Sequence, residues 1–138
     1  MGKVMASIAT ESADYGTPAP APAVILAGGE TTVTLKGKGK GGRNQELVLS
    51  ALKIIGDRKG IAILSGGTDG IDGNSPYAGA VCDSQTFKNA HKLNLDIDKF
   101  IENNDSSTFF ERTGGVIETG KTGTNVMDIL IMVVGAVR

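Results

Sequence analysis

Glycine is the residue that most limits how this chain can fold, because its 20 glycines among 138 residues are grouped along the sequence. They gather around residues 28–29, 37–42, 66–73 and 114–123, each time beside a short run of aliphatic or β-branched residues. Glycine adopts backbone conformations that other residues avoid, so it is favoured in tight turns and where a backbone approaches a ligand closely. The pattern predicts short strands that end in glycine-rich loops.

The remaining composition indicates one globular domain without a nucleic-acid or membrane partner. A hydrophobic content of 40% with 21% charged residues is typical of a folded protein of this length. The net charge of −1 and the aromatic content of 4% argue against nucleic-acid binding, which uses basic surfaces and stacking side chains. No apolar run is long enough for a membrane helix, and Cys82, the single cysteine, is expected to be a packed thiol. We therefore expect a cytoplasmic protein, and the sequence leaves open its assembly into a homo-oligomer.

Hydrophobic periodicity alternates between helical and extended segments along the chain. The sequence predicts helices over residues 3–13, 44–55, 84–91, 97–103 and 106–112, and strands over residues 24–27, 31–36, 61–64, 78–82, 116–118 and 128–134. Residues 17–23 alternate Pro and Ala, which favours an extended connector over a helix. Because strands and helices alternate, we predict a single layered α/β domain with a mixed, largely parallel β-sheet flanked by helices.

Basic residues and glycines alternate in the segment KGKGKGGR at residues 36–43, which contains no acidic side chain. Glycine lets backbone N–H groups approach an anion, and a helix that begins near Asn44 places the positive end of its dipole there. This combination is typical of a phosphate or carboxylate site, with Lys38, Lys40 and Arg43 as its cations. A solvated basic loop explains the same residues, so both interpretations stay open at this point.

A second glycine-rich segment, SGGTDGIDG at residues 65–73, follows the strand predicted over residues 61–64. It places Asp69 and Asp72 in a turn at the carboxyl end of a strand, where α/β proteins commonly bind ligands. Mg²⁺ that is bound together with phosphates typically takes one or two carboxylates, so this pair is a candidate metal site. In the alternative interpretation both aspartates cap turns of their own backbone.

The segment GVIETGKT at residues 115–122 matches the letters of a phosphate-binding P-loop. A P-loop needs a strand before its first glycine and a helix directly after its Lys-Thr pair. Here the strand predicted over residues 116–118 lies inside the motif, and a poor helix start follows it. We therefore expect no P-loop, although Thr122, Thr124 and Asn125 form a donor-rich turn that can contact phosphate.

Four of these motifs, in this order, resemble the MOFRL domain. They are GGETTV at residues 28–33, GKGKGGRNQE at 37–46, GTDGIDG at 67–73 and TGKTGTNV at 119–126. That domain is the C-terminal domain of a class of glycerate 2-kinases that are also named hydroxypyruvate reductases, and the resemblance runs from about residue 3 to the end of the chain. The family usually has Pro where this chain has Lys121, and Asn where it has Met127.

The resemblance implies that residues 1–138 are the C-terminal part of an enzyme that phosphorylates D-glycerate to 2-phosphoglycerate with ATP and Mg²⁺. The active site of the family lies in a cleft between this domain and a larger N-terminal kinase domain, which this sequence lacks. We therefore expect the isolated chain to be inactive and to act with that kinase domain in cis or in trans. The alternative is a stand-alone phosphate-binding or regulatory module without catalysis.

The matched motifs also supply the candidate site residues. Arg43, Asp69 and Asp72 are the candidate catalytic residues, and the two aspartates are the candidate Mg²⁺ ligands. The candidate residues for binding substrate or phosphate lie in the same loops: Lys38, Lys40, Asn44, Gln45, Glu46, Thr68, Thr122, Gly123, Thr124 and Asn125.

Overall fold

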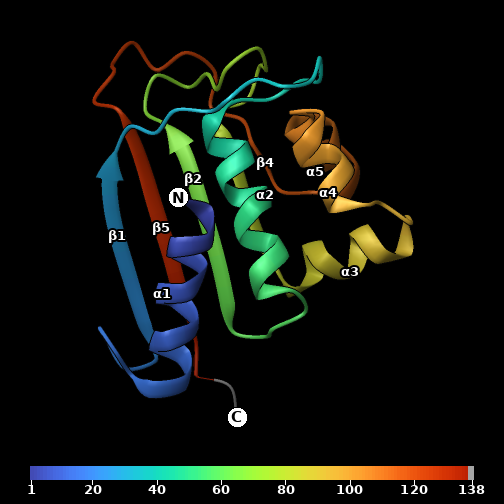
Figure 1. Cartoon of the computed structure of the whole chain (residues 1–138). Coiled ribbons are helices and arrows are strands. Elements are labelled where there is room, and N and C mark those ends of the chain that lie inside the picture. Colours follow the sequence, from blue (N-terminus) through green and yellow to red (C-terminus); the bar gives the residue numbers. More distant parts are fainter. Residues whose placement is uncertain (137–138) are drawn as a thin grey trace.

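A computed structural model describes residues 1–136 as a layer of helices packed on a β-sheet (Figure 1). Along the chain the elements are α1 (Gly2–Tyr15), β1 (Ala23–Gly29), α2 (Arg43–Ile55), β2 (Ile61–Gly67), β3 (Gly79–Asp83), α3 (Ser84–Lys92), α4 (Ile97–Glu102), α5 (Ser106–Thr113), β4 (Val116–Ile117) and β5 (Asp128–Val134). The predicted α/β class is therefore confirmed. None of the helices in this part of the chain is long and apolar enough to cross a membrane.

The five strands form one sheet in the order β1-β5-β2-β3-β4, and each pair of neighbouring strands in it is antiparallel. The prediction of a largely parallel sheet is therefore wrong. The chain passes from β1 through α2 to β2, and β1 and β2 do point in the same direction, as the alternation of strands and helices suggested (Figure 1). However, β5 returns from the end of the sequence, lies between them in the opposite direction and pairs with both.

Some local expectations also need correction. Residues 31–36 form no strand and run as an irregular, largely exposed segment between β1 and α2. Helix α2 begins at Arg43, before the start near Asn44 that the sequence predicted, so Gly42 is its N-cap and Asn44 is buried within its first turn. The Pro/Ala connector joins α1 to β1, although Ala23 already belongs to the strand. The other predicted elements lie within a few residues of their expected positions.

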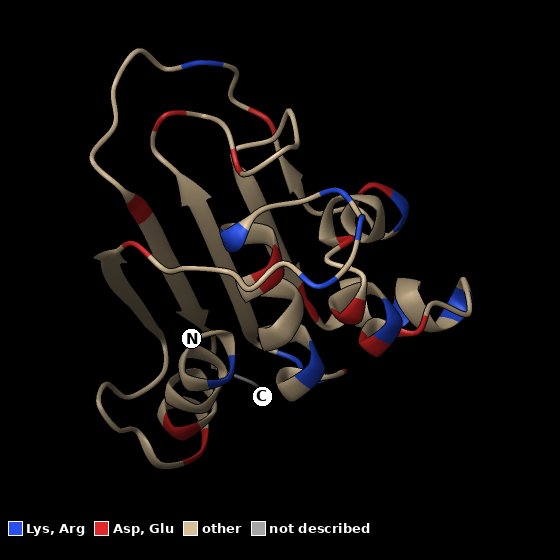
Figure 2. Ribbon diagram, turned by 45° about the horizontal axis from the view of Figure 1, so that its top comes forward, with Lys and Arg blue, Asp and Glu red and all other residues tan. Residues whose placement is uncertain are grey.

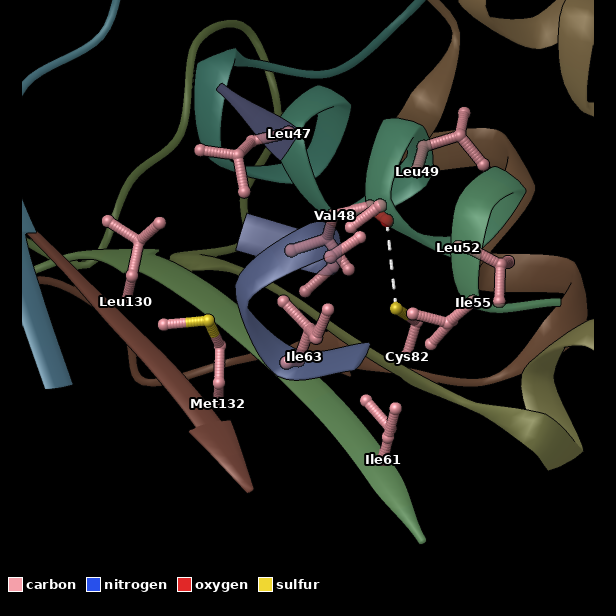
Figure 3. Close-up of a cluster of buried hydrophobic side chains, with 14 of the residues drawn as sticks. Leu47, Val48, Leu49, Leu52, Ile55, Ile61, Ile63, Cys82, Leu130 and Met132 are labelled. Atoms are coloured by element: carbon pink, nitrogen blue, oxygen red, sulfur yellow. Dashed lines mark hydrogen bonds between the residues drawn. The ribbon is translucent and has the colours of Figure 1, made fainter. Parts of the chain in front are cut away.

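The hydrophobic core lies between α2 and the sheet, as the close-up in Figure 3 shows. Helix α2 contributes five buried aliphatic side chains from successive turns, and alternate residues of β2 and β5 meet them: Leu47, Val48, Leu49, Leu52 and Ile55 from the helix, and Ile61, Ile63, Leu130 and Met132 from the strands. Cys82 is 1% exposed, and its thiol donates to the backbone carbonyl of Val48 at 3.6 Å. The prediction of a packed thiol is confirmed, and burial raises the pKa of this thiol.

The opposite face of the sheet is open and aliphatic. Successive residues of a strand point to opposite faces, so the neighbours of the core residues point outward. On β1 and β5 these are Val24, Leu26, Ile129 and Val133, which are 63%, 69%, 44% and 43% exposed. An antiparallel sheet with one face in water normally carries polar side chains on that face. In residues 1–136 the helices lie on the other side, so this aliphatic face stays uncovered (Figure 1).

The paired glycines Gly66 and Gly79 provide a matched test of how closely β2 and β3 pack. A Cβ atom at Gly79 would overlap the backbone carbonyl of Ser65, whereas one at Gly66 would meet its nearest neighbour at 3.5 Å. We expect Gly79→Ala to lower the free energy of unfolding by about 1–3 kcal/mol, because a backbone atom cannot move aside cheaply. Gly66→Ala should change it by less than about 0.5 kcal/mol. Urea denaturation of both variants measures the difference, and equal losses would contradict this description.

Candidate functional site

The loops that carry the matched motifs gather at one end of the sheet, where β1 and β2 finish and β5 begins (Figure 1). Backbone hydrogen bonds join these loops directly. Asn74 donates its N–H to the carbonyl of Gly41 at 3.1 Å, and Thr68 donates its N–H to the carbonyl of Met127 at 3.0 Å. The site therefore combines segments that are far apart in the sequence, and the antiparallel return of β5 brings the last of them into place.

The carboxylate of Asp72 lies against the first turn of α2. One oxygen accepts from the backbone N–H of Asn44 at 3.1 Å and from its side-chain amide at 3.3 Å. The other accepts from the backbone N–H of Gln45 at 2.8 Å and from its side-chain amide at 3.2 Å. Asp72 is only 1% exposed, and burial raises its pKa although these four N–H donors oppose the shift. The helix N-terminus that the sequence marked as an anion site thus binds a carboxylate of the protein itself.

The side chains that follow Arg43 in the motif also have partners within the protein. Asn44 accepts from the hydroxyl of Ser65, and Gln45 donates to the hydroxyl of Ser75 at 2.6 Å. Glu46 accepts from the side-chain amide of Asn104 at 2.7 Å. These three residues were predicted to contact substrate or phosphate, and the structure places them in a network that fixes the start of α2.

In the basic glycine loop at residues 36–42, backbone N–H groups also donate hydrogen bonds to other parts of the protein. The side-chain oxygen of Asn104 accepts from its first two N–H groups at 2.7 and 2.9 Å, and Asp105 accepts from the N–H of Lys40 at 2.9 Å. These amides are therefore not available to cradle an anion. The side chains of Lys38 and Lys40 are exposed, and Figure 2 shows the basic positions along the loop that enters α2. Sequence reasoning missed the Asn-Asp pair, which could be read only as an ordinary helix cap before α5.

Arg43 opens α2 and pairs with Asp128, the first residue of β5. Its Nε donates to one carboxylate oxygen at 2.7 Å and its Nη2 to the other at 2.9 Å, so the contact is bidentate. Glu30 lies farther from Nη2, at 3.4 Å, and its side chain is 55% exposed, compared with 2% for Asp128. The hydrogen bond to Asp128 raises the pKa of Arg43 despite partial burial. Among the described residues these contacts use Nε and Nη2, so Nη1 is the nitrogen that can contact a ligand.

Arg43 lines two cavities, with volumes of about 460 and 490 Å³. Glu30, Arg43 and Glu46 line both of them, and the irregular segment at residues 31–33 forms another shared wall. Each volume is within the usual range for a small-molecule site. Arg43 thus lies on the wall that the two cavities share. Sequence reasoning missed Glu30 and Asp128, the two acidic residues that contact it.

The other predicted contact residues form a separate, more exposed cluster. The Thr68 hydroxyl donates to the Met127 carbonyl at 2.7 Å, and the backbone N–H of Thr122 donates to the Asp69 carbonyl at 3.2 Å. The side-chain amide of Asn125 lies 3.5 Å from a carboxylate oxygen of Asp69. The structure therefore brings together residues from the third and fourth motifs: Thr68, Asp69, Thr122, Gly123, Thr124 and Asn125.

Two further expectations concern phosphate and metal chemistry. No helix follows Thr122 before β5, and β4 lies inside the P-loop-like motif, so the expectation that this motif is not a P-loop is confirmed for the described chain. Across residues 1–136 no three His, Cys, Asp or Glu side chains are placed to hold a metal ion. Asp72 does not fit a Mg²⁺ ligand, because both its oxygens already accept N–H donors. Asp69 is only half-buried, and its carboxylate has longer contacts, with the backbone N–H of Ile71 at 3.2 Å and the side-chain amide of Asn125 at 3.5 Å.

Comparison with known proteins identifies a consistent set of relatives. The MOFRL family profile matches residues 23–128. The chain is 41% identical to a glycerate 2-kinase of Pyrococcus horikoshii, over 99% of this chain and 31% of that protein. It is 42% identical to a D-glycerate 2-kinase of Thermotoga maritima, over 94% of this chain and 31% of that protein.

A solved structure agrees with these sequence relatives. The crystal structure of a glycerate kinase from Thermotoga maritima matches 96% of this chain and 32% of that chain, with a TM-score of 0.94 and 41% sequence identity. The chain therefore spans about a third of the length of the proteins that it resembles.

We expect Asp72→Asn to lower the free energy of unfolding by about 2–3 kcal/mol. The amide keeps one acceptor oxygen but directs its own N–H groups at buried donors, and hydrogen bonds to a charged acceptor are among the stronger ones. Asp69→Asn is the matched control, with an expected change below about 0.5 kcal/mol at a half-buried loop position. Thermal and urea denaturation compare the two variants. Two similarly small losses would show that the Asp72 carboxylate is not what holds the start of α2.

Met127 provides a second test, because its φ of 72° lies in the left-handed region. The other two non-glycine residues with positive φ in the described chain are asparagines, Asn94 and Asn104. Asparagine tolerates this conformation better than methionine. We expect Met127→Asn to raise the free energy of unfolding by about 0.5–1 kcal/mol. Val126→Asn, at a neighbouring exposed position without positive φ, should give no gain in the same denaturation experiment.

Proposed function

Because this chain belongs to the MOFRL family, we propose that it forms the C-terminal domain of an ATP-dependent glycerate 2-kinase. The observation that carries this proposal is the close agreement with the Thermotoga maritima glycerate kinase in both sequence and backbone. The substrate is D-glycerate, the product is 2-phosphoglycerate, and the setting is the cytoplasm. The rest of the enzyme is a kinase domain, supplied in the same chain or by a partner.

Arg43 is the residue that we place on the reacting groups. Phosphoryl transfer depends mainly on positioning and on stabilising the charge of the transferred group. A guanidinium is planar and permanently charged, so it suits either the transferring phosphoryl group or the carboxylate of glycerate. The two cavities support this placement, since Arg43 lines both of them and each has a volume suited to a small molecule.

The exposed residues around Arg43 have supporting roles in this proposal. Lys38 and Lys40 add positive potential at the mouth of the site, which salt screens over about 10 Å. The cluster of Thr68 with residues 122–125 supplies hydroxyl and amide donors to substrate or phosphate. Bound Mg²⁺ neutralises part of the phosphate charge, and Asp69 is the carboxylate that would hold it. Asp72 keeps the start of α2 in place and takes no part in metal binding.

A stand-alone anion-binding module is less well supported. Such a module needs a preformed anion site, and the backbone N–H groups best suited to one already bond to Asn104, Asp105 and Asp72. The guanidinium of Arg43 is also already paired with the carboxylate of Asp128. A kinase domain that closes over the cavities would exclude water and strengthen the remaining electrostatic contacts. We therefore expect the isolated chain to have no kinase activity.

The test is a chimera in which this chain replaces the matching third of the Thermotoga maritima D-glycerate 2-kinase. The chimera should phosphorylate D-glycerate with ATP, and the isolated chain should not. Arg43→Lys in the chimera should lower kcat/KM by about 30- to 1000-fold, corresponding to about 2–4 kcal/mol of lost transition-state stabilisation. The exposed Lys38→Ala variant should lose less, and its loss should vary with salt. An active chimera that is insensitive to Arg43→Lys would remove Arg43 from the site.

A melting curve accompanies these kinetics, because the bond to Asp128 gives Arg43 a structural role that its sequence position did not indicate. Arg43→Lys gives up the bidentate contact, so we expect some loss of stability as well as activity. Assays well below the melting temperature of the variant separate the two effects. Turnover of D-glycerate by the isolated chain, above the level of a mock preparation, would contradict the need for a second domain.

A further inference from the structure

We propose that Asp128 is the positioning residue of this site: it holds the Nε and Nη2 edge of the Arg43 guanidinium so that Nη1 is presented to the substrate. The inference rests on the role of Arg43 in the proposed function. It adds a second residue, which lies outside the four motifs that pointed to the site.

The backbone of Asp128 is held by strands on both sides. It begins the strand that pairs with β1 on one side and with β2 on the other, opposite Gly29 and Gly67. Both cross-strand neighbours lack a side chain, so the carboxylate has room to turn toward α2. The Asp128 side chain is only 2% exposed, and both its carboxylate oxygens accept from Arg43. Because the sheet holds the Asp128 backbone, its carboxylate restricts the movement of the Arg43 guanidinium that it binds.

The contact to Arg43 has the geometry that fixes direction. Two parallel N–H···O bonds, at 2.7 and 2.9 Å, define the plane of the guanidinium as well as its distance. Glu30 makes one longer contact from an exposed side chain, which adds charge but little orientation. The guanidinium plane is therefore set by Asp128, and Nη1 is the nitrogen that this contact leaves without a partner among the described residues.

The charges around Arg43 predict how loss of this contact should appear in kinetics. Asp128 and Glu30 together bring two negative charges to one guanidinium, so the site is not strongly attractive to anions in the ground state. Removing the Asp128 charge makes the local potential more positive while it releases the guanidinium. Ground-state binding of glycerate and ATP is then kept or improved, whereas the alignment needed in the transition state is lost.

The experiment is a double-mutant cycle in the chimera. We expect Asp128→Asn to lower kcat by about 10- to 100-fold, with KM for D-glycerate unchanged or lower. Because Asp128 acts through Arg43, adding Asp128→Asn to the Arg43→Lys variant should cost less than about threefold further. Glu30→Gln, which removes the other nearby carboxylate, should lower kcat by much less than Asp128→Asn. Circular dichroism melting curves confirm that each variant is folded at the assay temperature.

Asp128→Glu keeps the proposal testable if Asp128→Asn fails to fold. It retains the charge but lengthens the side chain, so it should displace the guanidinium and lower kcat by about tenfold. Losses that multiply in the double mutant, or a rise in KM with unchanged kcat, would overturn the positioning role. Failure of the proposed function looks different, because the unsubstituted chimera would then be inactive or indifferent to Arg43→Lys.

Discussion

The hydrogen bonds of the buried Asp72 carboxylate are the contacts on which the arrangement of the site depends. They join the loop after β2 to the first turn of α2, the helix that also fills the core. The N-cap, Gly42, fits only because it has no side chain, since a Cβ atom there would overlap the Asp72 carboxylate. Arg43 is the next residue, so the contact between Asp72 and the first turn of α2 also fixes its position. A negative charge that stabilises a helix start thus also fixes the residue that faces the cavities.

Local periodicity in the sequence predicted most helices and strands, and it failed where long-range pairing decides the outcome. Helix α2 and strand β5 carry unmistakable apolar patterns, and both lie where they were expected. The direction of the sheet was wrong because the crossover from β1 to β2 is local, whereas the return of β5 between them is not. The alternating segment at residues 31–36 has the pattern of a strand but finds no partner strand, so it stays irregular.

The sequence predicted which loops form the candidate site, but not which way their side chains point. The glycine motifs do converge, but Asp72, Asn44 and Gln45 turn inward to bond with one another. The same types of polar residue cap helix ends and contact ligands. The sequence alone therefore cannot distinguish the two roles. The role of Asp128 could not be predicted from the sequence for a related reason. It stands alone at the start of an apolar strand, and only the fold brings Arg43 beside it.

The open aliphatic face of the sheet affects how this domain responds to heat and denaturant. Val24, Leu26, Ile129 and Val133 already touch water in the folded chain, so unfolding newly exposes less apolar surface than the chain length suggests. Apolar exposure is the main source of the heat-capacity increase on unfolding, which is typically about 12–15 cal/mol/K per residue. The heat-capacity increase on unfolding this domain should fall below that range, so the free energy of unfolding should vary less with temperature. The denaturant m-value should also be lower than is usual for a chain of this length. A protein surface that covers this face would increase both the heat-capacity change and the m-value.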